Sequence, residues 1–277
     1  MSGEPASRAR PAVPPAGRPR RWLLLPGWGF GPGVWDPVRD ALPARLSTLA
    51  LAPFAREAGH ALAAAHAQAG AVRDPDARVA GLVAAWLGGL RAQAGGAEPV
   101  GLVGWSLGGL LAIEWARRHP DEVAALVLVA TTPRFVQVPG WGCAMPRADF
   151  VAFEQIARTR METAFARLCS LCALGQSEPA ALARRLRALG CRETTPGALA
   201  AGLEVLGAAD LRAVAAPAQP TALLHGDLDA VVPCAAAEHW AGRLRATRFA
   251  RLPDAGHAVP LAHAARVSDA IIALSGD

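Results

Sequence analysis

The sequence predicts an α/β protein: a mostly parallel β-sheet with helices on both faces and one helical insertion. The sheet and its helices are predicted because short apolar runs alternate along the chain with segments whose apolar residues recur every three or four positions. Strands that alternate with helices in this way pair in parallel and are buried on both faces. The insertion is predicted because this alternation stops over residues 134–209, where the sequence is helical in pattern and rich in arginine, and then resumes.

The first half of the chain contains four runs that we expect to form strands. The run Trp22-Leu23-Leu24-Leu25, for example, is stopped by Pro26-Gly27. The four expected strands are 22–25, 46–51, 100–103 and 125–130. The expected helices are 35–42, 76–90 and the segment from the end of the third strand to Arg118. Asp76 is the expected N-cap of the long helix, and His119-Pro120 ends the helix that follows.

The second half resumes the alternation with a strand, a helix, a strand and a helix. These are expected in order at 221–225, 235–243, 248–252 and 262–274. The chain therefore divides into a core, residues 21–133 and 210–277, and a helical lid, residues 134–209. Residues 1–20 contain Arg, Pro, Ala and Gly without the apolar stretch of a secretory signal, so we expect a disordered tail on a cytoplasmic protein.

Composition excludes several classes of protein. The chain has 277 residues, of which 52% are hydrophobic, enough for a substantial core and too many for a disordered protein. No run approaches the roughly 20 apolar residues of a membrane-spanning helix. All 28 basic residues are arginine, and Lys, Asn and Tyr are absent, so the net charge of +5 partly reflects a compositional bias. Without a supporting motif, this charge does not predict a nucleic-acid partner.

The five cysteines show no spacing typical of a metal site or a disulfide framework. Cys169-Ser-Leu-Cys172 is a CxxC pair, but no second pair follows, and the surrounding sequence is helical in pattern. We therefore interpret both cysteines as small apolar residues on one helix face, and we expect neither a metal ion nor another cofactor.

The segment Gly104-Trp105-Ser106-Leu107-Gly108 lies between an expected strand and an expected helix, and has the Gly-x-Ser-x-Gly spacing of a nucleophile elbow. In such an elbow the serine occupies a sharp, strained turn, so the residues two before and two after it must lack clashing side chains. The turn lifts the serine oxygen above the sheet and directs the N-terminus of the next helix toward it. The spacing therefore predicts Ser106 as a nucleophile and the backbone N–H of Leu107 as a donor to an oxyanion.

A serine nucleophile needs a base, and in this architecture the acid and the histidine follow it in that order. His257 fits the base because it lies in a loop directly after the expected strand 248–252, whereas the other six histidines precede the serine or lie in expected strands, helices or helix ends. Two carboxylates follow the strand 221–225. We favour Asp229 as the acid because it lies at the loop tip, and we expect Asp227 to make a turn or a cap.

The oxyanion hole needs a second donor, which the loop after the first strand supplies. This loop is Pro26-Gly27-Trp28-Gly29, whose glycines allow a close approach of the backbone, so we assign the N–H of Trp28. The rings of Trp28 and Trp105 also lie beside the nucleophile and predict an apolar acyl pocket. The alternative is that both are ordinary core tryptophans.

Together these motifs resemble the α/β-hydrolase family. The segments that carry the resemblance are Pro26-Gly27-Trp28-Gly29, Gly104-Trp105-Ser106-Leu107-Gly108-Gly109, Gly226-Asp227-Leu228-Asp229-Ala-Val-Val-Pro233 and Gly256-His257. Within that family, the Gly-Trp-Gly loop and the Gly-Trp-Ser-Leu-Gly-Gly elbow are similar to those of the pimeloyl-acyl-carrier-protein methyl ester esterases of biotin synthesis. The likeness extends from about Trp22 to Leu274.

The resemblance implies a monomeric serine esterase without a cofactor that removes the methyl group from a carrier-bound pimeloyl ester. It also implies that arginines of the lid bind the acidic acyl-carrier protein, and Arg167 and Arg184 are the matching positions; the alternative for each is a solvated helix face. The sequence departs from the family pattern in three ways. Pro26 stands where histidine is usual, residues 52–57 replace a glycine-rich loop, and a first pair of strands is missing, so about six strands are expected.

Other functions remain open at this point. A generalist short-chain carboxylesterase uses the same catalytic groups and differs in the size of its acyl pocket. A lyase of this fold also uses them. A non-catalytic binding protein of the same fold is disfavoured, because Ser106, Asp229 and His257 are all present in the expected order.

Overall fold

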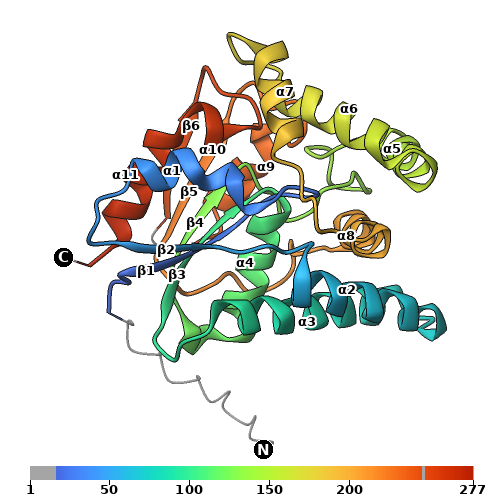
Figure 1. Ribbon diagram of the computed structural model, residues 1–277, viewed down its shortest axis with the longest axis horizontal. Coiled ribbons are helices and arrows are strands. Elements are labelled where there is room, and N and C mark those ends of the chain that lie inside the picture. The colour runs from blue at the N-terminus through green and yellow to red at the C-terminus, as the bar shows by residue number, and fades with distance from the viewer. Residues whose placement is uncertain (1–16, 245–246, 277) are drawn as a thin grey trace, which may run out of the picture.

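The computed structural model describes residues 17–244 and 247–276, and Figure 1 shows how they are arranged. Of the tail predicted over residues 1–20, residues 1–16 lie outside the described residues. The end of that segment joins the body of the protein. The carbonyl of Pro19 accepts a hydrogen bond from the N–H of Gly276 at 3.3 Å, and the carbonyl of Arg20 accepts one from Ser47 at 3.0 Å. The packed body therefore begins before residue 21.

A six-stranded, wholly parallel sheet forms the centre of the described chain, in the order β2-β1-β3-β4-β5-β6. Its strands are β1 (Arg21–Leu25), β2 (Ser47–Ala50), β3 (Val100–Trp105), β4 (Val123–Val129), β5 (Thr221–Gly226) and β6 (Thr247–Leu252). The predicted α/β fold is confirmed, and so is the expected number of strands. Because β1 pairs with both β2 and β3, the strand order reverses there, and ligands of such sheets bind at the carboxyl ends of strands beside the reversal.

Helices cover both faces of the sheet. Their bounds are α1 (Asp36–Asp40), α2 (Arg56–Gln68), α3 (Pro75–Ala94), α4 (Leu107–Arg118), α5 (Arg147–Thr159), α6 (Met161–Ala173), α7 (Pro179–Ala188), α8 (Pro196–Ala208), α9 (Cys234–Ala241), α10 (Val259–Ala262) and α11 (Ala264–Leu274). The connections between neighbouring parallel strands are right-handed. Connections that lead toward opposite edges of the sheet therefore place their helices on opposite faces. Accordingly α1, which packs on α11, lies on one face, and α3 and α4 lie together on the other.

Four elements differ from the sequence predictions. Helix α2 was not predicted. The N-cap of α3 is Asp74, whose carboxylate accepts the N–H of Asp76 at 3.0 Å, so the expected cap at Asp76 is wrong by two residues. Strand β4 begins at Val123 instead of residue 125. The last expected helix, 262–274, is α11, which begins at Ala264, and the short helix α10 before it was not predicted; His263 between the two has a non-helical φ of −130°.

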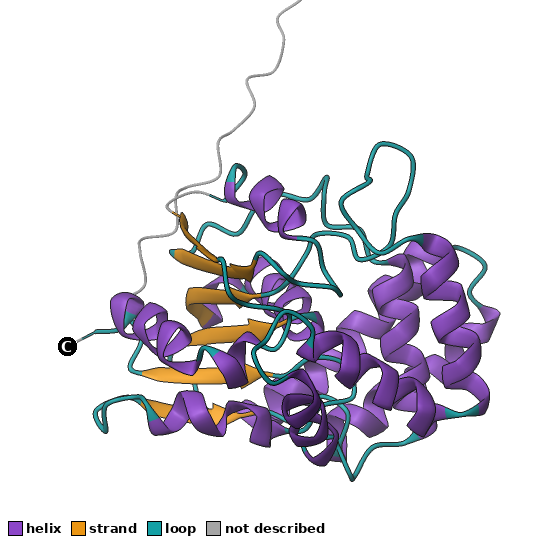
Figure 2. Cartoon of the chain, turned by 90° about the horizontal axis from the view of Figure 1, so that it is seen from above, coloured by secondary structure: helices purple, strands orange, loops and turns teal. Residues whose placement is uncertain are grey.

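The segment between β4 and β5 forms the helices α5 to α8, which gather beyond the ends of the strands (Figures 1 and 2). Helix α8 is nearly all apolar and packs against α2 and α3, so it is the part of this segment that is most deeply built into the molecule. Helices α5, α6 and α7 follow one another in contact on its outer side. No helix of the described chain is long and apolar enough to cross a membrane.

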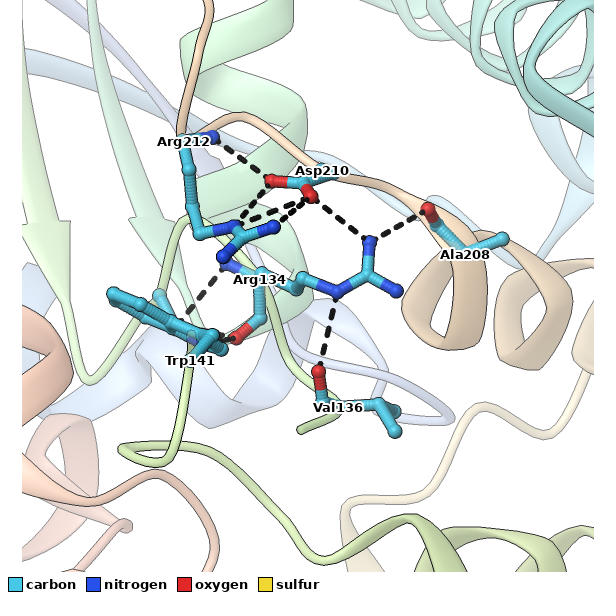
Figure 3. A network of polar contacts seen from close by, with 7 residues as sticks. Arg134, Val136, Trp141, Ala208, Asp210 and Arg212 are labelled. Atoms are coloured by element: carbon cyan, nitrogen blue, oxygen red, sulfur yellow. Dashed lines mark hydrogen bonds and ion pairs between the residues drawn. The ribbon is translucent and has the colours of Figure 1, made fainter. Parts of the chain in front are cut away.

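A polar network joins the two ends of this helical segment (Figure 3). Arg134, which follows β4, forms an ion pair with Asp210 at 3.2 Å and donates to the carbonyl of Ala208 at the end of α8. Asp210 also pairs with Arg212 at 2.7 Å, and the guanidinium of Arg212 lies over the ring of Trp141. The network holds the start and the end of the segment together at the edge of the core.

Candidate active site

Ser106 lies in the turn between β3 and α4, and its backbone has the strained φ of +56°. A Cβ at Gly104 would lie 2.4 Å from the carbonyl oxygen of Gly108, and a Cβ at Gly108 would lie 2.1 Å from that of Leu25. The two glycines are therefore required by close contacts of backbone with backbone. Such a serine conformation costs on the order of 1–3 kcal/mol. It is held by the Ser106 N–H, which donates to Val129 at 2.9 Å, and by the Thr131 hydroxyl, which donates to the Ser106 carbonyl at 2.8 Å.

Two backbone N–H groups that have no partner in the described chain lie beside this serine. One belongs to Leu107, the first residue of α4, and the other to Trp28 in the loop after β1. The loop approaches closely, since a Cβ at Gly27 would lie 3.4 Å from the Cβ of Ser106. The indole of Trp28 is anchored in turn by a 2.9 Å hydrogen bond to the carbonyl of Leu199 in α8. Two convergent, unpaired N–H groups, one of them at a helix N-terminus, suit an oxyanion.

His257 and Asp229 form a buried pair at the carboxyl ends of β5 and β6. Nδ1 of His257 lies 2.7 Å from Oδ2 of Asp229, and both side chains are almost fully buried. The other carboxylate oxygen, Oδ1, accepts the backbone N–H groups of Val231 and Val232, each at 2.8 Å. A third ring, that of His225, places its Nε2 3.2 Å from Oδ2.

These partners determine the pKa of Asp229. Burial raises the pKa of a carboxyl group, but here the charge of His257 and the hydrogen bonds from His225 and His257 more than offset it and hold the pKa far below its ordinary value. Asp229 is thus a permanent carboxylate against the imidazole.

Asp227 has a different environment. Its carboxylate forms an ion pair with Arg251 at 2.9 Å and accepts a contact from the thiol of Cys234 at 3.4 Å. The hydrogen bond from Arg251 holds the pKa of Asp227 below its ordinary value. Of the two carboxylates considered from the sequence, the structure brings Asp229 to His257.

The loop that carries His257 is fixed by its neighbours. The carbonyl of His257 accepts the indole N–H of Trp105 at 2.9 Å, and the N–H of Ala258 donates to Cys172 at the end of α6. A Cβ at Gly256 would lie 1.9 Å from the carbonyl oxygen of Leu174, so this loop and α6 are in close contact. The hydroxyl of Ser106 makes no hydrogen bond with His257 in the described structure, although both side chains line one cavity. Such bonds often tighten only when substrate is bound.

The cavity above Ser106 has a volume of about 40 Å³. Its walls are almost entirely apolar and come from the loops after β1, β4, β5 and β6, the elbow and helices α5, α6 and α8. They include Trp28, Phe30, Trp105, Met145, Phe153 and Leu203. Both tryptophans predicted for an acyl pocket line it. The ring of Trp28 packs edge-on against Phe153, with centroids 5.7 Å apart, and Trp105 packs against Phe30 at 4.8 Å.

The arginines predicted to contact a carrier protein lie on the outer helices. Arg167 on α6 and Arg184 on α7 are both exposed, and neither forms an ion pair with another described residue. Arg167 lines an adjoining cavity of about 210 Å³ together with Asp149. This cavity shares Met145, Phe153, Leu171 and Val231 with the one above Ser106. Arg184 lines neither cavity.

Two further points concern residues that the sequence analysis weighed differently. The loop at residues 52–57 is fixed from α3, because the Gln93 side chain binds the N–H and the carbonyl of Ala52 at 3.1 and 3.3 Å. His225 was set aside as a strand residue, yet it touches Asp229; the four-residue spacing from Asp229 across a tight turn was the available signal.

Among the described residues, no group of three or more His, Cys, Asp or Glu side chains is arranged to hold a metal ion.

A parallel sheet with a strand–serine–helix turn is the architecture of the α/β hydrolases. The sequence model of the α/β hydrolase fold matches residues 75–264, and the chain belongs to this family. Two curated relatives are each a pimeloyl-[acyl-carrier protein] methyl ester esterase. That of Aromatoleum aromaticum is 36% identical over 267 residues, covering 87% of this chain and 92% of the relative. That of Chromobacterium violaceum is 34% identical over 242 residues, covering 87% and 88%.

Solved structures agree on the fold. A bromoperoxidase from Bacillus anthracis superposes with a TM-score of 0.74 at 14% identity, covering 94% of this chain and 92% of that one. An esterase from Exiguobacterium antarcticum superposes with a TM-score of 0.71 at 16% identity, covering 93% and 92%. At this level of identity the two structures show the fold alone.

Proposed function

We propose that this protein is a serine carboxylesterase that hydrolyses the methyl ester of pimeloyl-acyl-carrier protein, releasing methanol and the free carboxylate. The observation that carries the proposal is the buried pair of His257 and Asp229, 2.7 Å apart, above the strained turn of Ser106. The substrate class rests on the relatives, two of which share more than a third of their aligned residues with this chain and bear the name of this esterase.

The geometry supports a two-step mechanism. The Ser106 hydroxyl attacks the ester carbonyl while Nε2 of His257 takes its proton, and Asp229 orients the ring and stabilises its cation. The carbonyl oxygen becomes an oxyanion that accepts the N–H groups of Trp28 and Leu107. Removal of one such donor costs about 3–4 kcal/mol in known cases. The intermediate then collapses, and methanol leaves with the proton from His257.

The second step regenerates the enzyme. Water, activated by His257, attacks the acyl-serine carbonyl, the bond to Ser106 Oγ breaks, and the serine regains its proton from His257. The free carboxylate then leaves on its carrier. No charge accumulates on His257 between turnovers, because each proton that it takes is returned in the same step.

The surroundings of the site fit an acyl chain that is tethered outside the protein. Apolar walls suit methylene groups, and the shared residues Met145, Phe153, Leu171 and Val231 connect the inner cavity to the outer one beside Arg167. A cavity of about 40 Å³ holds only a few water molecules. Entry of a seven-carbon chain therefore requires side chains of the cavity wall to move, and the exposed arginines Arg167 and Arg184 suit an acidic carrier protein.

The test compares hydrolysis of methyl pimeloyl-acyl-carrier protein with that of p-nitrophenyl butyrate, using Ser106→Ala as the control. Serine-dependent turnover with a preference for the carrier-bound ester supports the proposal. Turnover of the short ester alone keeps the catalytic assignment and replaces the substrate with that of a generalist esterase. Turnover that survives in Ser106→Ala overturns the catalytic assignment.

A further inference from the structure

His225 contacts the same carboxylate oxygen of Asp229 as the base, His257, does. It is the penultimate residue of β5, and its side chain is fully buried. Its Nε2 lies 2.8 Å from the carbonyl oxygen of Val232 and 3.2 Å from Oδ2 of Asp229. Two histidines therefore flank the same carboxylate, and the mechanism above uses only His257.

The contacts of the ring determine where its proton lies. Nε2 faces two oxygen acceptors and no donor, so Nε2 must carry the hydrogen and share it between them. Nδ1 is buried and has no hydrogen-bond partner in the described structure. A protonated Nδ1 would leave a buried donor without an acceptor, so the neutral Nε2–H tautomer fits the site. At a buried position where one ring nitrogen has no partner, histidine offers no advantage over an apolar residue unless its other nitrogen makes a functional hydrogen bond.

The hydrogen bonds of the Val232 peptide show what the Nε2–H of His225 does. Its N–H donates to Oδ1 of Asp229 at 2.8 Å, and its carbonyl accepts from His225. A single imidazole N–H thus holds Oδ2 directly and holds the peptide that binds Oδ1. Without it, Oδ2 keeps His257 as its remaining side-chain donor, and the loop that carries the N–H groups of Val231 and Val232 keeps only the 3.4 Å hydrogen bond from the N–H of Asp229 to Gly226 as a described backbone bond to β5.

We propose that His225 is a positioning residue for the catalytic acid, which keeps Oδ2 of Asp229 directed at Nδ1 of His257. This inference rests on the proposed function, because it assumes that Asp229 and His257 act together on Ser106. His225 itself touches no substrate. Its effect passes through the orientation of the carboxylate and therefore appears in turnover, not in substrate binding.

Three substitutions separate this role from simple packing. The amide nitrogen of glutamine can occupy the place of Nε2, that of asparagine lies nearer to Nδ1, and leucine has no donor. With p-nitrophenyl butyrate as substrate, we expect His225→Leu and His225→Asn to lower kcat by about 10- to 100-fold with KM within about twofold, as for loss of a hydrogen bond to a charged group. We expect His225→Gln to stay within about threefold of the unchanged protein.

Matched controls complete the experiment. His263, which also buries a ring nitrogen without a partner but does not contact Asp229, should tolerate leucine with unchanged kcat. In an Asp229→Asn background, His225→Leu should lower kcat no further, because the residue it acts through is already disabled. If His225→Leu does not fold, His225→Gln and His225→Asn at matched melting temperatures decide the question.

Three results would overturn the inference: an unchanged kcat in His225→Leu, equal losses in the glutamine and asparagine variants, or additive losses in the double variant. Failure of the catalytic assignment is seen separately, since Ser106→Ala would then remain active on p-nitrophenyl butyrate. Loss of activity in Ser106→Ala together with a neutral His225→Leu would reject only the role of His225.

Discussion

Asp227 and Asp229 are separated by one residue and have opposite environments. Asp229 is enclosed by donors from two imidazoles and two backbone N–H groups, whereas Asp227 pairs with Arg251 at the surface. Asp229→Asn keeps the shape but presents an amide to the histidine, which favours the wrong tautomer. We expect kcat to fall by about 10⁴-fold, as for the equivalent change in serine proteases.

Asp227→Asn is the matched control, because it makes the same chemical change two residues earlier in the same turn. It should leave kcat within about threefold, since an exposed ion pair contributes little. Steady-state kinetics of both variants on p-nitrophenyl butyrate measure the difference. A larger loss in Asp227→Asn than in Asp229→Asn would mean that the acid has been assigned to the wrong carboxylate.

At this scale the sequence predicts residues whose role depends on local spacing. Ser106 requires glycines at 104 and 108 because backbone atoms approach those positions to within 2.4 Å, and such a requirement is visible in the sequence. His225 was not predicted, because its role arises only when the turn after β5 folds back and brings Asp229 and Val232 against it. The four-residue spacing between His225 and Asp229 was the one local sign of this contact.

Among the elements, α4 links the nucleophile to the stability of the fold. Its N-terminus carries Ser106, and near its other end Glu114 is buried with a side chain only 5% exposed. The Glu114 carboxylate binds Arg117 at 2.9 Å and Arg118 at 2.7 Å. Burial raises the pKa of Glu114, but the hydrogen bonds and charges of the two arginines more than offset this, and the pKa is lowered.

We expect Glu114→Gln to lower the free energy of unfolding by about 1–3 kcal/mol at neutral pH, the range for hydrogen bonds to a charged group. A carboxyl group whose pKa is lowered by folding stabilises the fold above its unfolded pKa, about 4.3 for glutamate, and loses that effect as pH falls through the folded value. The difference between the two proteins should therefore be constant near neutral pH and shrink below about pH 4.

Urea unfolding at several pH values measures this difference. Glu238→Gln on α9 is the control, because Glu238 also pairs with an arginine but its side chain is 46% exposed, so a change of under about 1 kcal/mol is expected. Equal effects of the two substitutions, or a Glu114 effect that grows in acid, would contradict the account of the α4 ion pairs.

The existence of most elements was predictable, because buried strands bounded by Pro and Gly have a distinct pattern. Helix α2 was not, since residues 56–68 are dominated by alanine, which fits apolar and polar positions equally. What fixes α2 is tertiary: a Cβ at Gly89 would lie 2.5 Å from the Cα of Ala58, so α2 and α3 pack at backbone distance. The short helix α10 was not predicted either, because its four residues are too few to show a helical spacing.

For the whole molecule, the decisive feature is where the chain between β4 and β5 lies. The sequence indicates helices there, and its arginines indicate an outer surface. It does not indicate that α8 is buried against α2 and α3 while α5, α6 and α7 lie outside, nor that Phe153 and Leu171 close the cavity above Ser106. These are contacts between segments far apart in the chain, which no local pattern records.

This arrangement places Arg167 and Arg184 on the outer helices, and the last prediction concerns their charge. Replacing both with glutamate should lower kcat/KM for methyl pimeloyl-acyl-carrier protein by about 10- to 100-fold at low salt, because complementary charge chiefly raises the rate of association. Activity on p-nitrophenyl butyrate, which is neutral, should remain within about twofold.

Salt supplies an independent measurement, since about 0.5 M sodium chloride reduces the screening length to a few ångströms. It should lower kcat/KM of the unchanged protein on the carrier-bound ester and have little effect on the double variant, so that the two converge. Arg45→Glu is the control: Arg45 is exposed just before β2, at the amino end of the sheet, opposite the strand ends that carry the site. Arg45→Glu changes the net charge half as much as the double variant does, so a loss of about half the logarithmic size would mean that net charge matters and position does not. A salt-insensitive kcat/KM would place carrier recognition elsewhere than on these two arginines.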